Sequence, residues 1–236
     1  MNALLPDIAV ITGASKGIGR AAARMLAAEG LHIIAVGRNE ADLKSLVREI
    51  EQNDGSSEYM VIDLTETDDV TRFAGLVADR GQPAILIHSA GLARVAKIEN
   101  INPEDWHAVI AVNLTAPFYL TQKLLPYMRT NSRIFFINSV AGKQVFPEWA
   151  AYCASKFGLR AMADALRQEL VQRQIHVTTL FPASVDTPMQ AALPYDWDTG
   201  KMLRADDVAR AIVYCCRQPH DVVIKELHLE NPAGLF

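Results

Sequence analysis

Three glycines fall within seven positions near the start of the chain, in the stretch TGASKGIG at residues 12–19. An apolar run, residues 8–11, comes directly before this stretch, and an alanine-rich run, residues 20–28, follows it. Glycine turns tightly and lets a ligand approach the backbone where a Cβ atom would obstruct it. A helix beginning here offers unpaired N–H groups and its positive dipole end to a phosphate. Since a plain strand-to-helix turn, the alternative, needs only one glycine, the stretch predicts a cradle for the pyrophosphate of a nucleotide.

Short apolar runs alternate with longer helical patterns along the whole chain. The predicted strands are 7–12, 32–36, 58–62, 84–88, 133–139, 176–181 and 222–229, and the predicted helices are 17–29, 40–52, 67–79, 102–128, 150–173 and 206–217. Strands that are apolar throughout are typical of a parallel sheet buried on both faces. The alternation predicts an α/β fold: a Rossmann-type, doubly wound parallel sheet of about seven strands flanked by helices. No linker or repeat interrupts residues 1–236, so a single domain is expected.

Composition narrows the classes of partner and compartment. Half of the 236 residues are hydrophobic, and the net charge of −4 is spread along the chain, which argues against a nucleic-acid partner. No apolar run approaches the ~20 residues of a membrane span, and the N-terminus lacks the basic start of a signal peptide. The three cysteines lack metal-site spacing, so we expect no metal and a reducing, cytoplasmic setting.

The residue after the second predicted strand indicates which cofactor the cradle holds. An acidic residue there would accept hydrogen bonds from the ribose hydroxyls of NAD, whereas Arg38 can pair with the additional phosphate of NADP. Lys16, inside the glycine loop, adds a second positive charge. NADP(H) is therefore expected over NAD(H), with two ordinary surface cations as the alternative.

Tyr152 and Lys156 form a candidate acid–base pair. They stand four residues apart near a helix start and therefore share a face. A nearby ammonium favours the phenolate and lowers the pKa of a tyrosine, which would then exchange a proton with a carbonyl or an alcohol. Ser139 ends the fifth predicted strand, at the edge where ligands of open α/β sheets lie, and is expected to hydrogen-bond the reacting oxygen. The alternative for Ser139 is an ordinary turn hydroxyl.

The glycine spacing, Ser139 and the motif YCASK at 152–156 occur in the order found in the short-chain dehydrogenases/reductases. The chain resembles this family over nearly its whole length. The resemblance implies reversible hydride transfer between a nicotinamide and a carbonyl or alcohol carbon. It also implies cofactor contacts from Gly13, Ser15, Lys16, Gly17, Ile18, Gly19, Arg38, Asp63, Leu64, Ser89, Ala90, Gly91, Tyr152, Lys156, Pro182, Val185 and Thr187. The sequence leaves open a second reading of Asp63, as the cap of the helix that starts near Thr67.

Asn113 is the fourth expected member of the catalytic group. Pro117 has no N–H, so the carbonyl of Asn113 would lose its helical partner and the helix would kink. The resemblance implies that this asparagine holds a water that links Lys156 to solvent. The alternative is an incidental kink with a buried, satisfied amide.

Residues 183–204 are expected to cover the substrate as a short lid. Met189 from this lid, with Val145 and Trp149 opposite, would complete an apolar pocket around Ser139 and Tyr152. Such a pocket suits a modest ketone or a 3-oxoacyl thioester better than a charged sugar. In the related proteins the helices matching 102–128 and 150–173 form a dimer contact. A homodimer is therefore expected, or a homotetramer if Leu235 and Phe236 also pack against a neighbour.

The chain departs from the family pattern at two places. His88-Ser89 stand where two asparagines are usual, and Ala183 replaces a glycine. We expect His88 to be a packed histidine without a chemical role. A non-catalytic NADP-binding regulator is a competing function, but such a protein would be expected to lack Tyr152 or Lys156. An epimerase or dehydratase of the extended branch is disfavoured by the glycine spacing and the short C-terminal region.

Overall fold

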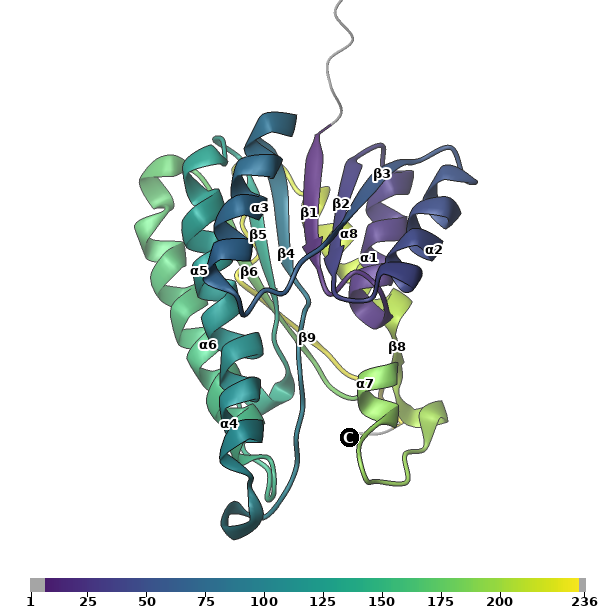
Figure 1. The fold of residues 1–236 in the computed structure, drawn as a ribbon, viewed down its shortest axis with the longest axis vertical. Helices are drawn as coiled ribbons and strands as arrows, with labels where there is room; N and C mark the ends of the chain where they lie inside the picture. The colour runs from purple at the N-terminus through teal and green to yellow at the C-terminus, as the bar shows by residue number, and fades with distance from the viewer. Residues whose placement is uncertain (1–6, 234–236) are drawn as a thin grey trace, which may run out of the picture.

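The computed structural model describes residues 7–233, and at its centre is a seven-stranded sheet with the order β3-β2-β1-β4-β5-β6-β9. All neighbouring strands in this sheet run parallel. The strands are β1 Ile8–Thr12, β2 His32–Gly37, β3 Ser56–Val61, β4 Pro83–His88, β5 Arg133–Ile137, β6 His176–Pro182 and β9 Glu226–Leu229. The strand order reverses between β1 and β4, which opens a crevice at their carboxyl ends. The predicted doubly wound fold is confirmed (Figure 1).

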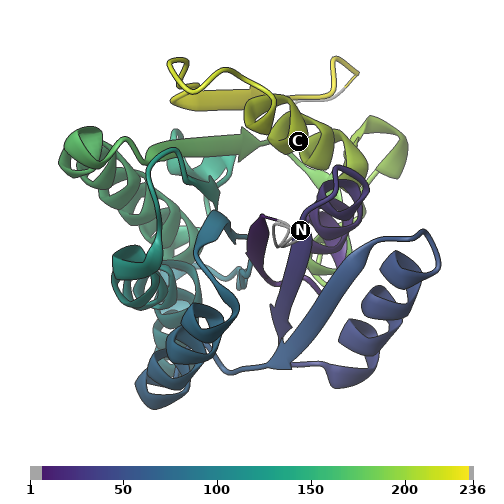
Figure 2. The same ribbon diagram turned by 90° about the horizontal axis from the view of Figure 1, so that it is seen from above.

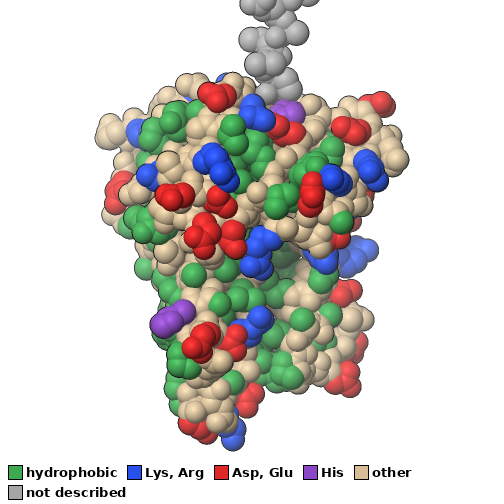
Figure 3. Space-filling model, in the orientation of Figure 1, with side chains coloured by type: hydrophobic (Ala, Val, Ile, Leu, Met, Phe, Trp, Pro, Cys, Tyr) green, Lys and Arg blue, Asp and Glu red, His purple; other side chains and the backbone are tan. Residues whose placement is uncertain are grey.

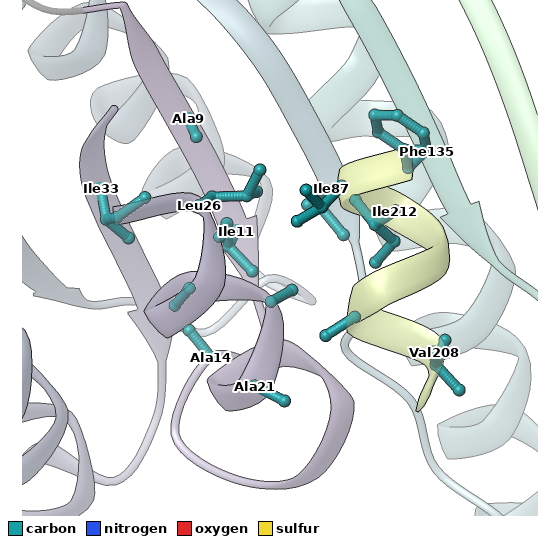
Figure 4. Packing of buried hydrophobic residues seen from close by; sticks show 14 of the residues in the cluster. Ala9, Ile11, Ala14, Ala21, Leu26, Ile33, Ile87, Phe135, Val208 and Ile212 are labelled. Atoms are coloured by element: carbon teal, nitrogen blue, oxygen red, sulfur yellow. The ribbon is translucent and has the colours of Figure 1, made fainter. Parts of the chain in front are cut away.

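Helices cover both faces of the sheet and make it the middle of three layers (Figure 2). One face is covered by α1 Gly17–Ala28, α2 Glu40–Glu51 and α8 Ala205–Cys216, and the other by α3 Thr67–Arg80, α5 Ala116–Leu124 and α6 Ala150–Glu169. β1 is buried at every residue because it lies between both layers. In the first layer, α1 and α8 pack side by side over the sheet, where Ile212 of α8 lies near Ile87 and Phe135 (Figure 4).

The segment predicted as the helix 102–128 is helical from Pro103 to Tyr127, but the type of helix changes along it. It starts as expected: Asn102 accepts a hydrogen bond from the Glu104 amide at 3.0 Å, and α4 covers Pro103–Ile110. A π-helical turn, Ala111–Thr115, then separates α4 from α5, and the amide of Ala116 donates to the carbonyl of Ala111. Pro117 lacks an N–H, and the chain absorbs this loss by a wider turn, where a simple kink was expected.

The end of β5 and the start of β9 also differ from the prediction. β5 ends at Ile137, two residues early, because the side chain of Ser139 caps a short 3-10 turn, Val140–Gly142. β9 begins at Glu226 instead of residue 222, because the amide of Val222 is held in a turn by the carbonyl of Pro219. The apolar residues before β9 therefore resemble a strand in sequence without forming one.

The expected lid, residues 183–204, has its own small framework. β7 Val185–Asp186 pairs in parallel with β8 Leu203–Arg204, and α7 Pro188–Ala191 lies between them in sequence. Strands of two residues carry no periodic pattern, so this pairing was missed. The pair anchors both ends of the lid below the carboxyl edge of the sheet (Figure 1).

Residues 1–6, which carry the argument against a signal peptide, lie outside the described residues, as do Leu235 and Phe236. Within 7–233 no helix has the length and apolar character of a membrane span.

Two helical glycines provide a test of the packing at the glycine loop. A Cβ on Gly19 of α1 would lie 2.4 Å from the carbonyl oxygen of Gly13, whereas a Cβ on Gly75 of α3 would meet nothing within 4 Å. We expect Gly19→Ala to lower the free energy of unfolding by about 1–3 kcal/mol through overpacking. Gly75→Ala should raise it by up to about 1 kcal/mol, because alanine has the higher helix propensity. Urea denaturation measures both, and equal shifts would contradict the prediction.

Candidate active site

Two cavities adjoin at the carboxyl edge of the sheet. One, of about 390 Å³, lies over the glycine loop, and the other, of about 410 Å³, lies between the end of β5, the start of α6 and the lid. They share the walls formed by Ile18, Ser89, Gly91, Thr187 and Met189. Figure 3 shows the surface hollowed between the upper body and the lower lobes, with lysine and arginine side chains near the hollow. We call the first cavity the cofactor cleft and the second the substrate pocket.

Most of the expected cofactor residues line the cofactor cleft. They are Gly13, Ser15, Lys16, Gly17, Ile18, Arg38, Asp63, Leu64, Ser89, Ala90, Gly91 and Thr187. Pro182 and Val185 line the substrate pocket instead, together with Tyr152 and Lys156. Gly19 is buried behind the cleft, so its place in the structure is that of a packing residue under the loop.

The glycine loop approaches the β4 loop so closely that a side chain cannot fit between them. Gly13 has φ +65°, and a Cβ there would lie 2.7 Å from the backbone of Ala90. Thr12 ties the two loops together, since its hydroxyl accepts hydrogen bonds from the amides of Ser89 and Ala90, at 3.1 and 3.2 Å. The same hydroxyl donates to the carbonyl of Ile87. Thr12 begins the glycine stretch, but the sequence argument gave it no role, because the loop that it fastens lies far away in the chain.

The two expected phosphate-binding cations differ in how free they are. Lys16 is exposed, and its Nζ lies 3.1 Å from a carboxylate oxygen of Asp42, a cleft residue that the sequence argument missed. Arg38 is exposed at the same cleft and makes no hydrogen bond or ion pair with any other residue of 7–233. An anion entering the cleft would therefore meet an available guanidinium at Arg38 and an ammonium that is shared with Asp42.

Asp63 does not cap α3. Its carboxylate accepts hydrogen bonds from the amide and the hydroxyl of Thr65, at 3.0 and 2.7 Å, and Glu66 occupies the cap position. These hydrogen bonds lower the pKa of Asp63, and the positive charge of Arg38 adds a smaller lowering against the opposing effect of burial. The capping alternative is thus wrong, and Asp63 stands at the cleft as an ionised turn residue.

The catalytic candidates Ser139, Tyr152 and Lys156 converge on the substrate pocket. Nζ of Lys156 lies 5.5 Å from the ring centroid of Tyr152 and donates a hydrogen bond of 2.9 Å to the carbonyl of Ile137 at the end of β5. The hydroxyl of Ser139 accepts a hydrogen bond from the Ala141 amide at 3.1 Å. Ser139 is therefore both a turn residue and a pocket residue.

Burial dominates the acid–base properties of the pair. It raises the pKa of Tyr152 to about 12, although a hydrogen bond with Ser139 acts in the opposite direction. It lowers the pKa of Lys156 to about 8. We expected the ammonium to lower the pKa of Tyr152, but in the protein alone desolvation of the phenolate outweighs any such effect.

Asn138, between β5 and Ser139, was missed by the sequence argument. Its side-chain amide donates to the carbonyl of Lys156 at 3.0 Å, and its carbonyl oxygen accepts from the Ser139 amide at 2.9 Å. Asn138 is buried, and it thereby fixes the strand end that carries Ser139 against the helix that carries Lys156. The signal in the sequence that could have found Asn138 is a polar residue directly after an apolar strand.

Asn113 lies behind the site, in the π-helical turn, and does not line either cavity. Its side chain is buried: it accepts from the Leu92 amide and donates to the Leu92 carbonyl, both at 2.8 Å, and to the Ser155 hydroxyl at 3.0 Å. The alternative of a buried, satisfied amide is therefore confirmed for the side chain. The expected water relay through the backbone carbonyl stays a prediction.

Three residues were expected to form the wall of the substrate pocket, and two of them lie there. Trp149 and Met189 line the substrate pocket, whereas Val145 does not and is 73% exposed. The expectation for Val145 is wrong because the loop before α6 turns this side chain towards solvent and presents Phe146 to the pocket instead.

His88 is a packed histidine, as expected. Its Nε2 lies 2.8 Å from the Thr121 hydroxyl, and its ring stacks on Phe136 at a centroid distance of 4.8 Å. Complete burial lowers the pKa of His88 to about 3, so the ring is neutral at physiological pH.

Comparison with known proteins agrees with this geometry. A family model for the short chain dehydrogenases matches residues 7–197. The chain belongs to the short-chain dehydrogenase family. Uncharacterized oxidoreductases of Staphylococcus saprophyticus and Staphylococcus epidermidis are 33% and 34% identical to it, over 96% and 93% of this chain and 98% and 95% of theirs. The chain is thus an oxidoreductase of this family.

Two solved structures illustrate the shared fold. An alcohol dehydrogenase from the archaeon Thermococcus sibiricus, complexed with 5-hydroxy-NADP, has a TM-score of 0.90 and 26% identity, with 97% of each chain covered. A metagenomic short-chain oxidoreductase in complex with NADP has a TM-score of 0.83 and 32% identity, with 94% of this chain and 96% of that chain covered.

The lowered pKa of Lys156 predicts how stability depends on pH. Between about pH 8 and the ordinary lysine pKa of 10.5, the unfolded chain binds more protons at this residue than the folded chain. The contribution of Lys156 to the free energy of unfolding therefore rises with pH across that window. The free energy of unfolding of the wild type minus that of Lys156→Met should increase from about pH 8 to about pH 10, as measured by urea denaturation. A difference that stays constant across this pH window would contradict the prediction.

Proposed function

We propose that this short-chain dehydrogenase reduces a carbonyl to a secondary alcohol with NADPH, and catalyses the reverse reaction with NADP⁺. The observation that carries the proposal is the position of Tyr152, Ser139 and Lys156 in a pocket that opens into the cofactor cleft. A group bound in the cleft and a carbonyl bound in the pocket would therefore meet beside the Tyr152 hydroxyl.

The cleft fits a dinucleotide phosphate in shape and in charge. The backbone of Gly13 leaves space that a Cβ would fill, and the start of α1 presents its N–H groups there. Arg38 supplies a cation at the edge of the same cleft that forms no hydrogen bond or ion pair with any other residue of 7–233. Gly13 and the residues after it would hold the pyrophosphate, Arg38 and Lys16 the additional phosphate, and Lys156 the nicotinamide ribose.

The proposed mechanism uses the pKa values of the buried pair. When bound, the cofactor supplies the hydride for the carbonyl carbon. Ser139 and Tyr152 hydrogen-bond the carbonyl oxygen and stabilise the negative charge that develops on it. With a pKa raised to about 12, Tyr152 is protonated at neutral pH and donates its proton to that oxygen. Lys156, with a pKa lowered to about 8, exchanges protons near neutrality and returns a proton to the Tyr152 phenolate. A water held at the backbone carbonyl of Asn113 would connect Lys156 to solvent.

We expect Tyr152→Phe to lose at least about 100-fold in kcat, because the ring stays but the proton donor is removed. NADPH binding, measured by fluorescence titration, should stay within about twofold of wild type, since the phenol contributes little to the affinity for the whole dinucleotide. Tyr127→Phe, at an exposed tyrosine away from both cavities, is the matched control. A Tyr152→Phe enzyme with substantial activity would remove Tyr152 from the acid role. Wild-type protein that binds NADPH but oxidises it with no ketone would support the regulator alternative.

We propose NADP(H) as the preferred cofactor. One support is the guanidinium of Arg38, which has no hydrogen-bond or ion-pair partner in the described part of the chain. The other is that the neighbours from Thermococcus sibiricus, a metagenome and Burkholderia cenocepacia were solved with 5-hydroxy-NADP or NADP. In Arg38→Asp the ratio of kcat/KM for NADPH over that for NADH should fall by at least about tenfold. The cation that binds the additional phosphate is replaced by a carboxylate, which repels it. Arg72→Asp, on α3 outside the cleft, should leave the ratio unchanged. An unchanged ratio in Arg38→Asp would show that the additional phosphate is bound elsewhere.

We also propose that the protein is a homodimer or homotetramer in the cytoplasm. Phe118 on α5 and Phe157 on α6 are 45% and 39% exposed, which leaves apolar surface on the two helices expected to form the contact. All three cysteines are free, as a reducing compartment requires. Sedimentation velocity of the purified chain tests the assembly, and a monomer at micromolar concentration would contradict it.

A further inference from the structure

The substrate pocket has a continuous wall of aromatic rings. Phe146 and Trp149 come from the loop before α6, and Tyr195 and Trp197 come from the lid. The Trp149 and Tyr195 rings are parallel within 6° at a centroid distance of 6.2 Å, and Trp197 meets Tyr195 edge-on at 5.2 Å. We call these four residues the aromatic wall.

The aromatic wall begins directly beside the proposed proton donor. The rings of Trp149 and Tyr152 meet edge-on, at a centroid distance of 5.4 Å and an angle of 72°. A substituent one or two bonds from a carbonyl carbon that is held at the Tyr152 hydroxyl would therefore lie against aromatic rings. Aromatic groups gain energy from edge-on and offset contacts with such rings beyond what burial of apolar area gives.

The pocket carries almost no charge. Among the described residues that line it, only Lys156 and Glu148 are charged side chains. Lys156 is buried and donates to the carbonyl of Ile137, whereas Glu148 is exposed at the pocket mouth. The pocket therefore offers an incoming anion no accessible cation and one carboxylate that repels it.

Glu148 is held in place by one hydrogen bond to its backbone and one to its side chain. Its backbone has φ +70°, a left-handed conformation that is strained for glutamate, and the Ala96 amide donates to its carbonyl at 2.9 Å. Its Oε2 accepts a hydrogen bond of 3.1 Å from the Tyr195 hydroxyl. The carboxylate thus links the loop to the lid and orients a ring of the aromatic wall.

We propose that the substrate is an uncharged ketone with an aromatic ring one or two bonds from the carbonyl carbon. This inference rests on the proposed carbonyl reduction and narrows its substrate class. It disfavours the alternative of a 3-oxoacyl thioester on a phosphate-bearing carrier, because such a carrier would bring negative charge to the mouth beside Glu148. The aromatic wall selects the ring, and Glu148 selects against anions.

Two ketones of the same size separate aromatic selection from general apolarity. The ring of 1-phenyl-2-propanone and that of 1-cyclohexyl-2-propanone are both insulated from the carbonyl, so the two ketones have similar intrinsic reactivity. With NADPH, wild-type kcat/KM should be about tenfold higher for the phenyl ketone. Tyr195→Leu should remove most of this preference, whereas Tyr195→Phe, which keeps the ring and loses only the hydroxyl, should retain it.

A second pair of ketones tests the role of Glu148. Methyl 4-acetylbenzoate is neutral and 4-acetylbenzoate is an anion at neutral pH. The ratio of kcat/KM for the anion over the ester should rise by about threefold or more in Glu148→Gln at low salt, because a like charge is removed. Glu99→Gln, at an exposed carboxylate outside the pocket, should leave the ratio unchanged.

The outcomes distinguish the inference from the function on which it rests. If no ketone oxidises NADPH or NADH, the proposed function fails and the substrate class fails with it. If the phenyl and cyclohexyl ketones are reduced equally well, or if a 3-oxoacyl thioester of N-acetylcysteamine is the better substrate, carbonyl reduction stands and the inference is overturned.

Discussion

The close contact between the loop after β1 and the loop after β4 is the constraint on which the rest of the site depends. Gly13 brings its backbone to a distance from Ala90 that no side chain allows, and the Thr12 hydroxyl fastens both loops with hydrogen bonds. Because the strand order reverses between these strands, this contact forms the floor of the cofactor cleft.

The second determinant is burial of the acid–base pair. Tyr152 and Lys156 lie on α6 beneath the lid, where loss of water disfavours both charged forms. The phenol is therefore kept neutral and the ammonium is made easier to deprotonate. The protonated phenol carries the proton that the proposed reduction of a carbonyl requires. Oxidation of an alcohol needs the phenolate, and the positive charge of an oxidised nicotinamide would favour that form.

Residues from distant parts of the chain share the control of this pair. Asn138 joins the end of β5 to the backbone of Lys156, and Asn113 joins the π-helical turn to Leu92 and Ser155. The lid completes the enclosure, since Tyr195 stacks on Trp149 and hydrogen-bonds Glu148. Buried amides with satisfied hydrogen bonds give the pocket a defined shape, and the lid adds Tyr195 and Trp197 to the pocket wall.

The sequence by itself determined the doubly wound sheet, the glycine loop, and the convergence of Ser139, Tyr152 and Lys156 on one edge. These features are encoded locally, in apolar runs, in the spacing of glycines and in a four-residue helical interval, so they can be recognised without knowing the contacts. The cap at Asn102 and the packed role of His88 could be predicted for the same reason.

Only the tertiary structure decided the properties that arise across space. The direction of the Tyr152 pKa depends on how deeply the ring is buried, which spacing to Lys156 does not reveal. The roles of Thr12 and Asn138, the solvent exposure of Val145 and the pairing of β7 with β8 depend on segments far apart in the chain. The stacking of Trp149 on Tyr195 is the clearest case, because 45 intervening residues separate the two rings in sequence. Such contacts are set by the packing of the whole domain, and no local pattern records them.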